Sequence, residues 1–327
     1  MDRRQFLFAS TAATFSMAGI RSAAAEDYPT RPVTMIVPFT AGGAGDILAR
    51  ALGARVEPVW GKPLVVENKP GAGGVIGALA TQKAEPDGYT LMIAPSATMA
   101  VNVSLFKALP YDPMKDFVPV ALAARTPFVL VVNPDIPVKS IPDLIKYAKE
   151  KGSNLSYATA GPGVPHHLFG ELLKSMIDIE MIPVAYRGSL PALNDVVAGH
   201  VPLMFVDLGP AMGIIQSGKV RPIGISTKER FAGMPDVPPL AEAGVPGFDA
   251  ASWQMVVAPG KTPKPIVEKL HADFKRVLDM PETKDLILKN GMLPATNTSV
   301  ASLQDFVKSE IDRWSKVVAK AGLTASQ

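Results

Sequence analysis

The chain has 327 residues, a formal net charge of +3 at neutral pH and no cysteine. Residues 1–25 carry Arg3, Arg4 and Arg21 against Asp2, so the rest of the chain has a net charge of only +1. A charge this small gives no support to nucleic-acid binding. The absence of cysteine excludes disulfides, a thiol nucleophile, thiolate metal sites and a lipidated N-terminal cysteine.

The first 25 residues have the pattern of an export signal. Arg3-Arg4 precedes a weakly apolar stretch, and Ala23-Ala24-Ala25 supplies the small residues that a signal peptidase needs, so we expect the mature chain to begin at Glu26. The arginine pair, with Arg21 beside the cleavage site, favours twin-arginine export, and an ordinary Sec signal with a chance arginine pair is the alternative. The apolar stretch is shorter than the roughly 18 to 20 residues of a spanning helix. We therefore expect a soluble periplasmic protein.

Strand-like apolar runs alternate with amphipathic helical segments along most of the chain, which predicts an α/β fold with parallel sheets. The first strand is expected at Val33–Val37, and a helix from Ile47 to Val59 follows it with its apolar residues on one face. Prolines bound a second helix, expected from Pro142 to Lys151. Further strands are predicted at Leu64–Val66, Leu91–Ala94, Phe128–Val132, Asn154–Ala158, Met181–Ala185, Val201–Phe205, Val220–Ile225 and Trp253–Ala258.

The length of the mature chain predicts two domains, because about 300 residues exceed the usual size of a single core. The segment from Pro263 onward has the pattern of two or three helices with no new strand–helix unit, and we expect it to pack back on the first domain. The predicted organisation is a lobe 1 of residues 26–125 plus 251–327 and a lobe 2 of residues 126–250, with a cleft between them.

The loop after the first strand, Pro38 to Asp46, is rich in glycine. Gly42, Gly43 and Gly45 let the backbone turn sharply and bring N–H groups close to a ligand, and the helix that follows adds the positive end of its dipole. The pattern predicts an anion site. It lacks both the Lys-Ser/Thr of a P-loop and the GxGxxG of a dinucleotide site. An ordinary turn capped by Asp46 is the alternative.

Three more strand–helix junctions combine small and polar residues, at 95–98, 159–167 and 186–189. All are expected where the C-terminal end of a strand meets a helix, which is the edge at which open α/β sheets bind ligands. Their convergence favours a ligand cleft more strongly than any one loop does.

Ordered motifs cover essentially the whole mature chain. They are Val37-Pro38-Phe39 with Gly42-Gly43 and Asp46, Val66–Gly74, Pro86–Leu91, Leu109–Pro113, Lys115–Phe117, Pro137–Ser140, Tyr157–Gly161, Tyr186–Ser189, Pro235–Pro238 and Glu242–Gly244. In these motifs the chain resembles the extracytoplasmic receptors of tripartite tricarboxylate transporters, often called Bug proteins.

The resemblance implies a type II periplasmic-binding-protein fold, in which two α/β lobes close on a carboxylate that is then delivered to a membrane permease of the same transport system. It implies that backbone N–H groups and helix ends hold the ligand, with Thr40–Asp46 gripping one carboxylate and Thr159–His167 approaching from the other lobe. Asp46 is similar to the family's aspartate that caps the helix and organises ligand-bridging water. We expect a monomer without cofactor, metal ion or nucleic-acid partner. The candidate ligand-binding residues are Phe39, Thr40, Ala41, Gly43, Gly45, Asp46, Ser96, Thr98, Thr159, Ala160, Gly163, Val164, His166, Tyr186, Arg187 and Asp207.

The sequence departs from the family's pattern at several of these positions. Thr40 stands where many relatives carry proline, and Gly45 where they carry serine or threonine. In the opposing loop Val164 and His166 replace two residues with hydroxyl groups. The segment 205–208 shifts the family's usual aspartate–asparagine pair and leaves Asp207 as its lone acidic candidate. Asp207 would repel an anionic ligand unless water or a ligand hydroxyl lay between them. These changes argue against a small dicarboxylate such as malate and make a larger or more aromatic acid an alternative.

Other side chains near the loops allow more than one interpretation. His166, at a helix start, is expected to donate to the ligand carboxylate, in which case acid binding weakens as the pH rises from about 5.5 to 8. His166, His167 and Glu171 do not predict a metal site, because only two further histidines exist and both are distant in the chain. Arg187 is either a partner of the carboxylate or part of a solvated or interlobe ion pair. Trp253 is expected in the core.

A transport receptor is the function that these features favour. A ligand sensor for a membrane signalling system would use the same fold and is the first alternative. A secreted α/β enzyme acting on an acidic substrate is the second, and the chain has no Gly-x-Ser-x-Gly elbow or intact cofactor fingerprint to support it.

Overall fold

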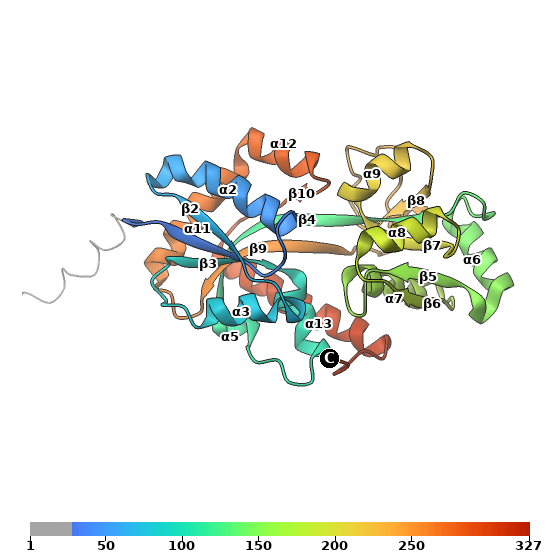
Figure 1. Cartoon of the computed structure of the whole chain (residues 1–327), viewed down its shortest axis with the longest axis horizontal. Helices are drawn as coiled ribbons and strands as arrows, with labels where there is room; N and C mark the ends of the chain where they lie inside the picture. Colours follow the sequence, from blue (N-terminus) through green and yellow to red (C-terminus); the bar gives the residue numbers. More distant parts are fainter. Residues whose placement is uncertain (1–27) are drawn as a thin grey trace, which may run out of the picture.

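The computed structural model describes residues 28–327, so the export signal expected at residues 1–25 lies outside the described residues. The chain forms two α/β lobes that lie side by side and are joined by two long strands, β4 (Phe117–Val132) and β9 (Ala251–Pro259) (Figure 1). The chain enters lobe 2 along β4 and returns to lobe 1 along β9. Both lobes therefore share one curled sheet, with the strand order β2-β1-β3-β9-β4-β7-β5-β6.

Lobe 1 contains five strands of this sheet and most of the long helices. Its strands are β1 (Val33–Val37), β2 (Leu64–Asn68), β3 (Thr90–Pro95), β9 and the first part of β4, with the short β10 (Leu293–Pro294) paired to β4. Its helical segments are α2 (Ala44–Trp60), η1 (Ala72–Gly74), α3 (Val75–Gln82), η2 (Ala97–Val101), α4 (Asn102–Leu105), α5 (Pro113–Asp116), α11 (Lys264–Asp279), α12 (Pro281–Lys289) and α13 (Val300–Lys320).

Lobe 2 is built from the second part of β4 and the strands that follow it. Its other strands are β5 (Ser156–Thr159), β6 (Ile182–Ala185), β7 (Leu203–Asp207) and β8 (Arg221–Ile225). Its helical segments are α6 (Ile141–Lys151), η3 (Gly152–Asn154), α7 (Pro165–Ile177), α8 (Ser189–Val197), α9 (Leu208–Gln216) and α10 (Leu240–Ala243).

The alternation of side chains along each strand explains how the helices cover both faces of the sheet. On β1, Met35 packs toward α2 and α11, whereas Ile36 packs toward α3 and α13. In lobe 2 the same alternation places Val129 with α8 and α9, and Leu130 with α6 and α7. The cluster that contains Ile36 and Leu130 is continuous through both lobes.

Helix α13 belongs to this continuous core and joins the lobes at their base. Trp314 of α13 stacks on Phe169 of α7, with ring centroids 5.6 Å apart. The indole N–H groups of Trp253 and Trp314 both donate to the buried carboxylate of Glu310, at 2.8 and 3.0 Å. Trp253 is only 1% exposed, so its predicted place in the core is confirmed.

All nine predicted strands are present, with ends that differ by a few residues, except that β4 begins at Phe117 and the prediction placed its start at Phe128. The expectation of parallel sheets holds within β1–β2–β3 and within β5–β6–β7 but is wrong for β4, β8 and β9, which pair antiparallel with their neighbours. The strands β4 and β9 carry the chain between the lobes in opposite directions, so they must lie antiparallel. Within residues 28–327, no helix is long and apolar enough to cross a membrane.

Candidate functional site

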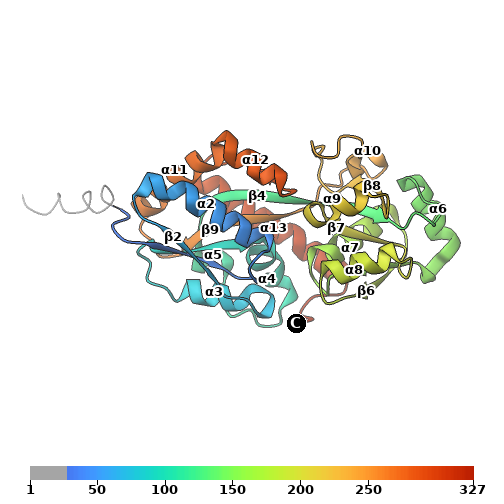
Figure 2. The ribbon, with the colours of Figure 1, turned by 45° about the horizontal axis from the view of Figure 1, so that its top comes forward.

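A cavity of 380 Å³, here called the first cavity, lies between the lobes at the N-terminal ends of α2, α7 and α9. Figure 2 shows the two lobes facing each other across the strands that connect them. Lobe 1 contributes the loop after β1 and residues of β3 and β9, and lobe 2 contributes the loop after β5 and the end of β7. A larger cavity of 580 Å³ lies on lobe 1 between α11 and the start of α13, away from these helix ends.

The start of α2 presents free backbone donors to the first cavity. Gly42 has φ of +85°, which turns the chain sharply, and Gly43 is the N-cap residue of the helix. The first helical bond runs from the Ile47 amide to the Gly43 carbonyl. The amides of Ala44 and Gly45 therefore have no partner within the helix and lie at the positive end of its dipole. This arrangement suits an anion.

Asp46 fixes the shape of this loop. Its carboxylate accepts hydrogen bonds from the Gly42 amide, the Asn68 side-chain amide and the Arg50 guanidinium, at 3.0 to 3.1 Å. The Arg50 hydrogen bond holds the pKa of Asp46 below its ordinary value, with smaller contributions from Gly42 and Asn68. Asp46 thus binds the loop from the third position of the helix, whereas the N-cap position itself belongs to Gly43.

The start of α7 faces the cavity from lobe 2. Its N-cap is Val164, whose carbonyl accepts from the amides of His167 and Leu168. Pro165 has no N–H group, so the amide of His166 is the donor at this helix end that has no partner within the helix. The α2 end thus has three amides without a helical partner, those of Ala44, Gly45 and Asp46, and the α7 end has one.

The imidazole of His166 is buried and held by its neighbours. Its Nε2 atom lies 3.0 Å from Oδ1 of Asp207 and 3.1 Å from the hydroxyl oxygen of Ser189. Phe128 packs against the ring edge-to-face at 5.0 Å. The Nδ1 atom is buried and finds no hydrogen-bond partner among the described residues. Asp207, the acidic candidate of lobe 2, is therefore paired with a histidine at the cavity wall.

Nine of the predicted ligand-binding residues line the first cavity. Those from lobe 1 are Phe39, Thr40, Gly43, Gly45 and Asp46, and those from lobe 2 are Ala160, Val164, His166 and Asp207. The structure thus brings together the two loops that were expected to oppose each other.

The other seven predicted residues do not line the cavity, and several of their polar groups bond to neighbouring residues of the fold. The Ser96 hydroxyl lies 3.0 Å from that of Ser252, and Thr98 is fully buried. These seven are Ala41, Ser96, Thr98, Thr159, Gly163, Tyr186 and Arg187.

Thr159, Gly163, Tyr186 and Arg187 of lobe 2 have defined places outside the lining. The Thr159 hydroxyl donates to the Gly161 carbonyl at 2.7 Å, and the Gly163 amide donates to Nδ1 of His167 at 3.1 Å. The Tyr186 hydroxyl donates to Asp195 at 2.6 Å, and burial together with this bond raises the pKa of Tyr186 to about 12. Arg187 is exposed.

The sequence profile of the tripartite tricarboxylate transporter family receptors matches residues 48–323. The chain belongs to this receptor family. It is 37% identical to the protein BugT of Bordetella pertussis over 301 residues, which cover 91% of each chain.

Solved structures of similar proteins confirm the two-lobed fold of a type II periplasmic binding protein. The structure of R. palustris Rpa4515 with adipate has a TM-score of 0.80 and 37% identity, covering 91% of this chain and 99% of that one. MatC from Rhodopseudomonas palustris, with bound malate, has a TM-score of 0.75 and 36% identity, covering 89% of this chain and all of the other.

The receptor has a cavity residue that the sequence analysis missed. Gln254 on β9 is 9% exposed and lines the first cavity, and a Cβ atom at Gly45 would lie 3.3 Å from its Oε1. Gln254 is the single polar residue inside the apolar run Trp253–Ala258. A buried polar residue in an apolar strand is unusual, and this signal could have identified it.

A second cavity of 500 Å³ adjoins the first and shares Gly43, Ala44, Asp207, Ser252 and Gln254 with it. It extends along the receptor toward the turn between α12 and β10, where its walls include Lys289 and Met292.

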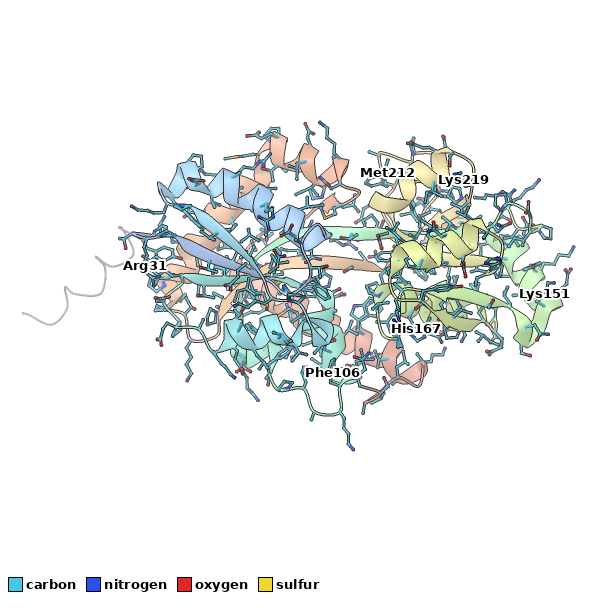
Figure 3. All side chains as sticks on the ribbon, in the orientation of Figure 1. Arg31, Phe106, Lys151, His167, Met212 and Lys219 are labelled. Atoms are coloured by element: carbon cyan, nitrogen blue, oxygen red, sulfur yellow. The ribbon has the colours of Figure 1, made fainter. Side chains whose placement is uncertain are left out.

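In the part of the receptor that the structure describes, no group of three or more His, Asp or Glu side chains is placed to hold a metal ion. His167 and Glu171 are 3.9 Å apart, and Glu171 also pairs with Lys174 at 3.0 Å and accepts from Tyr157 at 2.7 Å. Burial lowers the pKa of His167. Figure 3 shows His167 on the side of lobe 2 that faces lobe 1.

Proposed function

We propose that this receptor captures a small organic carboxylate in the first cavity and delivers it to a membrane permease of the tripartite tricarboxylate type. The observation that supports this proposal is the meeting of the N-terminal ends of α2, α7 and α9 at one cavity between the lobes. Helix N-termini with free amides are established anion sites. The bound adipate and malate of the two similar receptors are acids of the same class.

The two lobes would hold one carboxylate from opposite sides. The amides of Ala44 and Gly45 would donate to it from lobe 1, and the amide of His166 from lobe 2. Asp207 does not prevent this binding, because its carboxylate lies 3.0 Å from Nε2 of His166 and is engaged with that ring. The carboxylate would replace water at donors that are already oriented, which lowers the entropic cost of binding.

We assign residues 26–125 plus 251–327 to lobe 1 and residues 126–250 to lobe 2. The chain passes between these segments in the middle of β4 and at the start of β9. Two crossing strands form a hinge about which the lobes can close on a ligand. We also propose that the protein is exported through the signal at residues 1–25 and acts in the periplasm as a monomer.

Binding without turnover is part of this proposal. His166 contacts both Ser189 and Asp207 through the same atom, Nε2. A catalytic triad instead uses one ring nitrogen for the hydroxyl and the other for the carboxylate. The three residues therefore do not form a serine nucleophile with its general base, and we assign them to ligand recognition.

The test is a thermal-shift screen of mono-, di- and tricarboxylates, aliphatic and aromatic, on the mature protein. We expect at least one acid to raise the melting temperature and to reduce the radius of gyration in solution scattering, with no product detected after prolonged incubation. A screen in which no carboxylate stabilises the protein, or the appearance of a product from the stabilising acid, contradicts the proposal.

A further inference from the structure

We propose that the second cavity is a subsite for the far end of the ligand, so that the acid is an elongated one with a second anionic group near Lys289. This inference rests on the proposed function, because it takes the first carboxylate to be bound at the α2 and α7 helix ends. It adds a chain length and a second charge to the description of the ligand.

The two cavities adjoin each other and share part of their walls. Gly43 and Ala44 of α2, Ser252 and Gln254 of β9 and Asp207 of β7 line both of them. The first cavity alone, at 380 Å³, already lies in the range of about 300 to 1,000 Å³ that is typical of small-molecule pockets. A short acid therefore leaves the adjoining 500 Å³ unused.

One buried polar group that lines the second cavity lacks a hydrogen-bond partner. Thr126 is 9% exposed, lines this cavity, and its hydroxyl finds no hydrogen-bond partner among the described residues. Gln254, which is equally buried, presents its amide to the same space. An unpaired buried hydroxyl costs about 1 to 3 kcal/mol, and a polar ligand group would remove that cost.

The remaining walls suit an apolar chain or ring that ends in a negative charge. Ile47, Phe128 and Met292 supply apolar surface. Phe128 packs edge-to-face with both His166 and Phe169. The exposed Lys289 lies at the rim and offers a positive charge.

The turn that follows Lys289, the last residue of α12, is anchored to lobe 2. A Cβ atom at Gly291 would lie 2.5 Å from the amide nitrogen of Gly209, so the backbones of the two lobes touch at this point. The contact fixes the α12–β10 turn beside the start of α9. The fold therefore holds the backbone of Lys289 beside the cavity.

The position of Asp207 restricts the middle of the ligand. Its carboxylate stands at the junction of the cavities, where it would repel a negative charge on a central atom of the acid. Acids with charges at both ends fit this arrangement, and a tricarboxylate with a central carboxylate does not. The ligand class is thus an α,ω-dicarboxylate, aliphatic or aromatic, longer than four carbons.

The experiment measures dissociation constants by calorimetry for succinate, adipate, suberate, hexanoate, octanoate and citrate. For the wild type we expect adipate or suberate to bind more tightly than succinate, and each to bind more tightly than the monocarboxylate of equal length. Citrate should bind most weakly. Tighter binding of succinate than of any longer dicarboxylate contradicts the subsite.

Variants then test the groups that we assign. Lys289→Met should weaken the binding of suberate about fivefold, the scale of an exposed ion pair, and leave the affinity for octanoate unchanged. Thr126→Val should weaken suberate about threefold through loss of one hydrogen bond. Lys316→Met is the matched control, because Lys316 is an exposed helical lysine that lines neither cavity.

The outcomes separate this inference from the proposed function. Equal loss of suberate and octanoate affinity in Lys289→Met, or no loss of either, overturns the subsite while carboxylate binding itself stands. If no acid of the series binds to the wild type and none in the wider screen stabilises it, the proposed function fails first.

Discussion

The two sides of the first cavity are built in different ways. In lobe 1 the ligand would meet a backbone loop that Asp46 holds through hydrogen bonds from Gly42, Asn68 and Arg50. In lobe 2 it would meet side chains, where His166 is held by Asp207 and Ser189. Backbone amides bind any carboxylate, whereas side chains can differ from one receptor to another. At the first cavity we therefore expect the lobe 1 loop to supply affinity for any carboxylate and the lobe 2 side chains to supply selectivity.

The largest effect on ligand binding is expected from Asp46. Asp46→Ala removes the acceptor that shapes the loop, and loss of charge-assisted hydrogen bonds at about 1.5 to 3 kcal/mol each should weaken every bound acid about tenfold to hundredfold. Calorimetry across the acid series measures the effect. Asp46→Asn, which keeps an acceptor for Gly42 but loses the charge facing Arg50, should show a smaller loss. If the variant lost affinity for only one acid of the series, the proposed roles of the two lobes would be wrong.

The next effect is on stability and concerns the contact between the lobes. Gly291→Ala places a methyl group against the Gly209 amide and forces alanine to φ of +73°, so we expect it to lower the free energy of unfolding by about 2 to 4 kcal/mol. Gly322→Ala is the matched control, with φ of +68° and no atom within 4 Å. It should cost about 1 kcal/mol, the left-handed backbone alone. Urea unfolding measures the loss of unfolding free energy for both variants. Equal losses would show that the interlobe contact adjusts easily to the added methyl group.

A smaller effect is expected from the histidine–aspartate pair in lobe 2. His166→Gln and Asp207→Asn should change the order in which acids are preferred, each by about threefold to tenfold, because they alter one or two hydrogen bonds at the cavity wall. The melting temperature without ligand should change little. The readout is the ratio of dissociation constants for two acids, and a uniform change in all acids would assign lobe 2 a general role instead.

The smallest effect is a pH dependence of stability from His167. Because burial lowers the pKa of His167 in the folded protein, the unfolded chain takes up the proton first, and stability falls as the pH decreases below the ordinary histidine value of about 6.5. His167→Asn keeps an acceptor for the Gly163 amide and cannot titrate. Between pH 7.5 and pH 5, the melting temperature should fall less for this variant than for the wild type. An unchanged slope would assign the pH dependence to other groups.

Local sequence patterns predicted much of this fold, and the misses have physical causes. Each predicted strand is present because short apolar runs between glycines and prolines have few alternatives. The first part of β4 escaped prediction because Phe117–Pro127 is buried on both faces and shows no alternation. The antiparallel return of β9 depends on pairing between distant segments, which no local pattern contains.

The site was predictable in its loops but less so in its side chains. Glycine and helix-start patterns located the loop from Thr40 to Asp46 and the loop around His166. The hydroxyls of Ser96 and Thr159, which the sequence placed among the candidate ligand-binding groups, form hydrogen bonds within the fold, and a small polar residue at a turn can serve either purpose. The second cavity needed the structure, since its walls come from segments as far apart as Ile47 and Met292.

Trp253 and Trp314, which both donate to the carboxylate of Glu310, can report on ligand binding through their fluorescence. Trp253 lies on β9 just inside lobe 1, and Trp314 stacks on Phe169 of α7, the helix whose N-terminal end faces the ligand. Two of the three indoles in the chain thus sit where the lobes meet, and the third, Trp60, packs at the end of α2. Lobe movement would change the surroundings of the first two, so intrinsic fluorescence can follow ligand binding without a label.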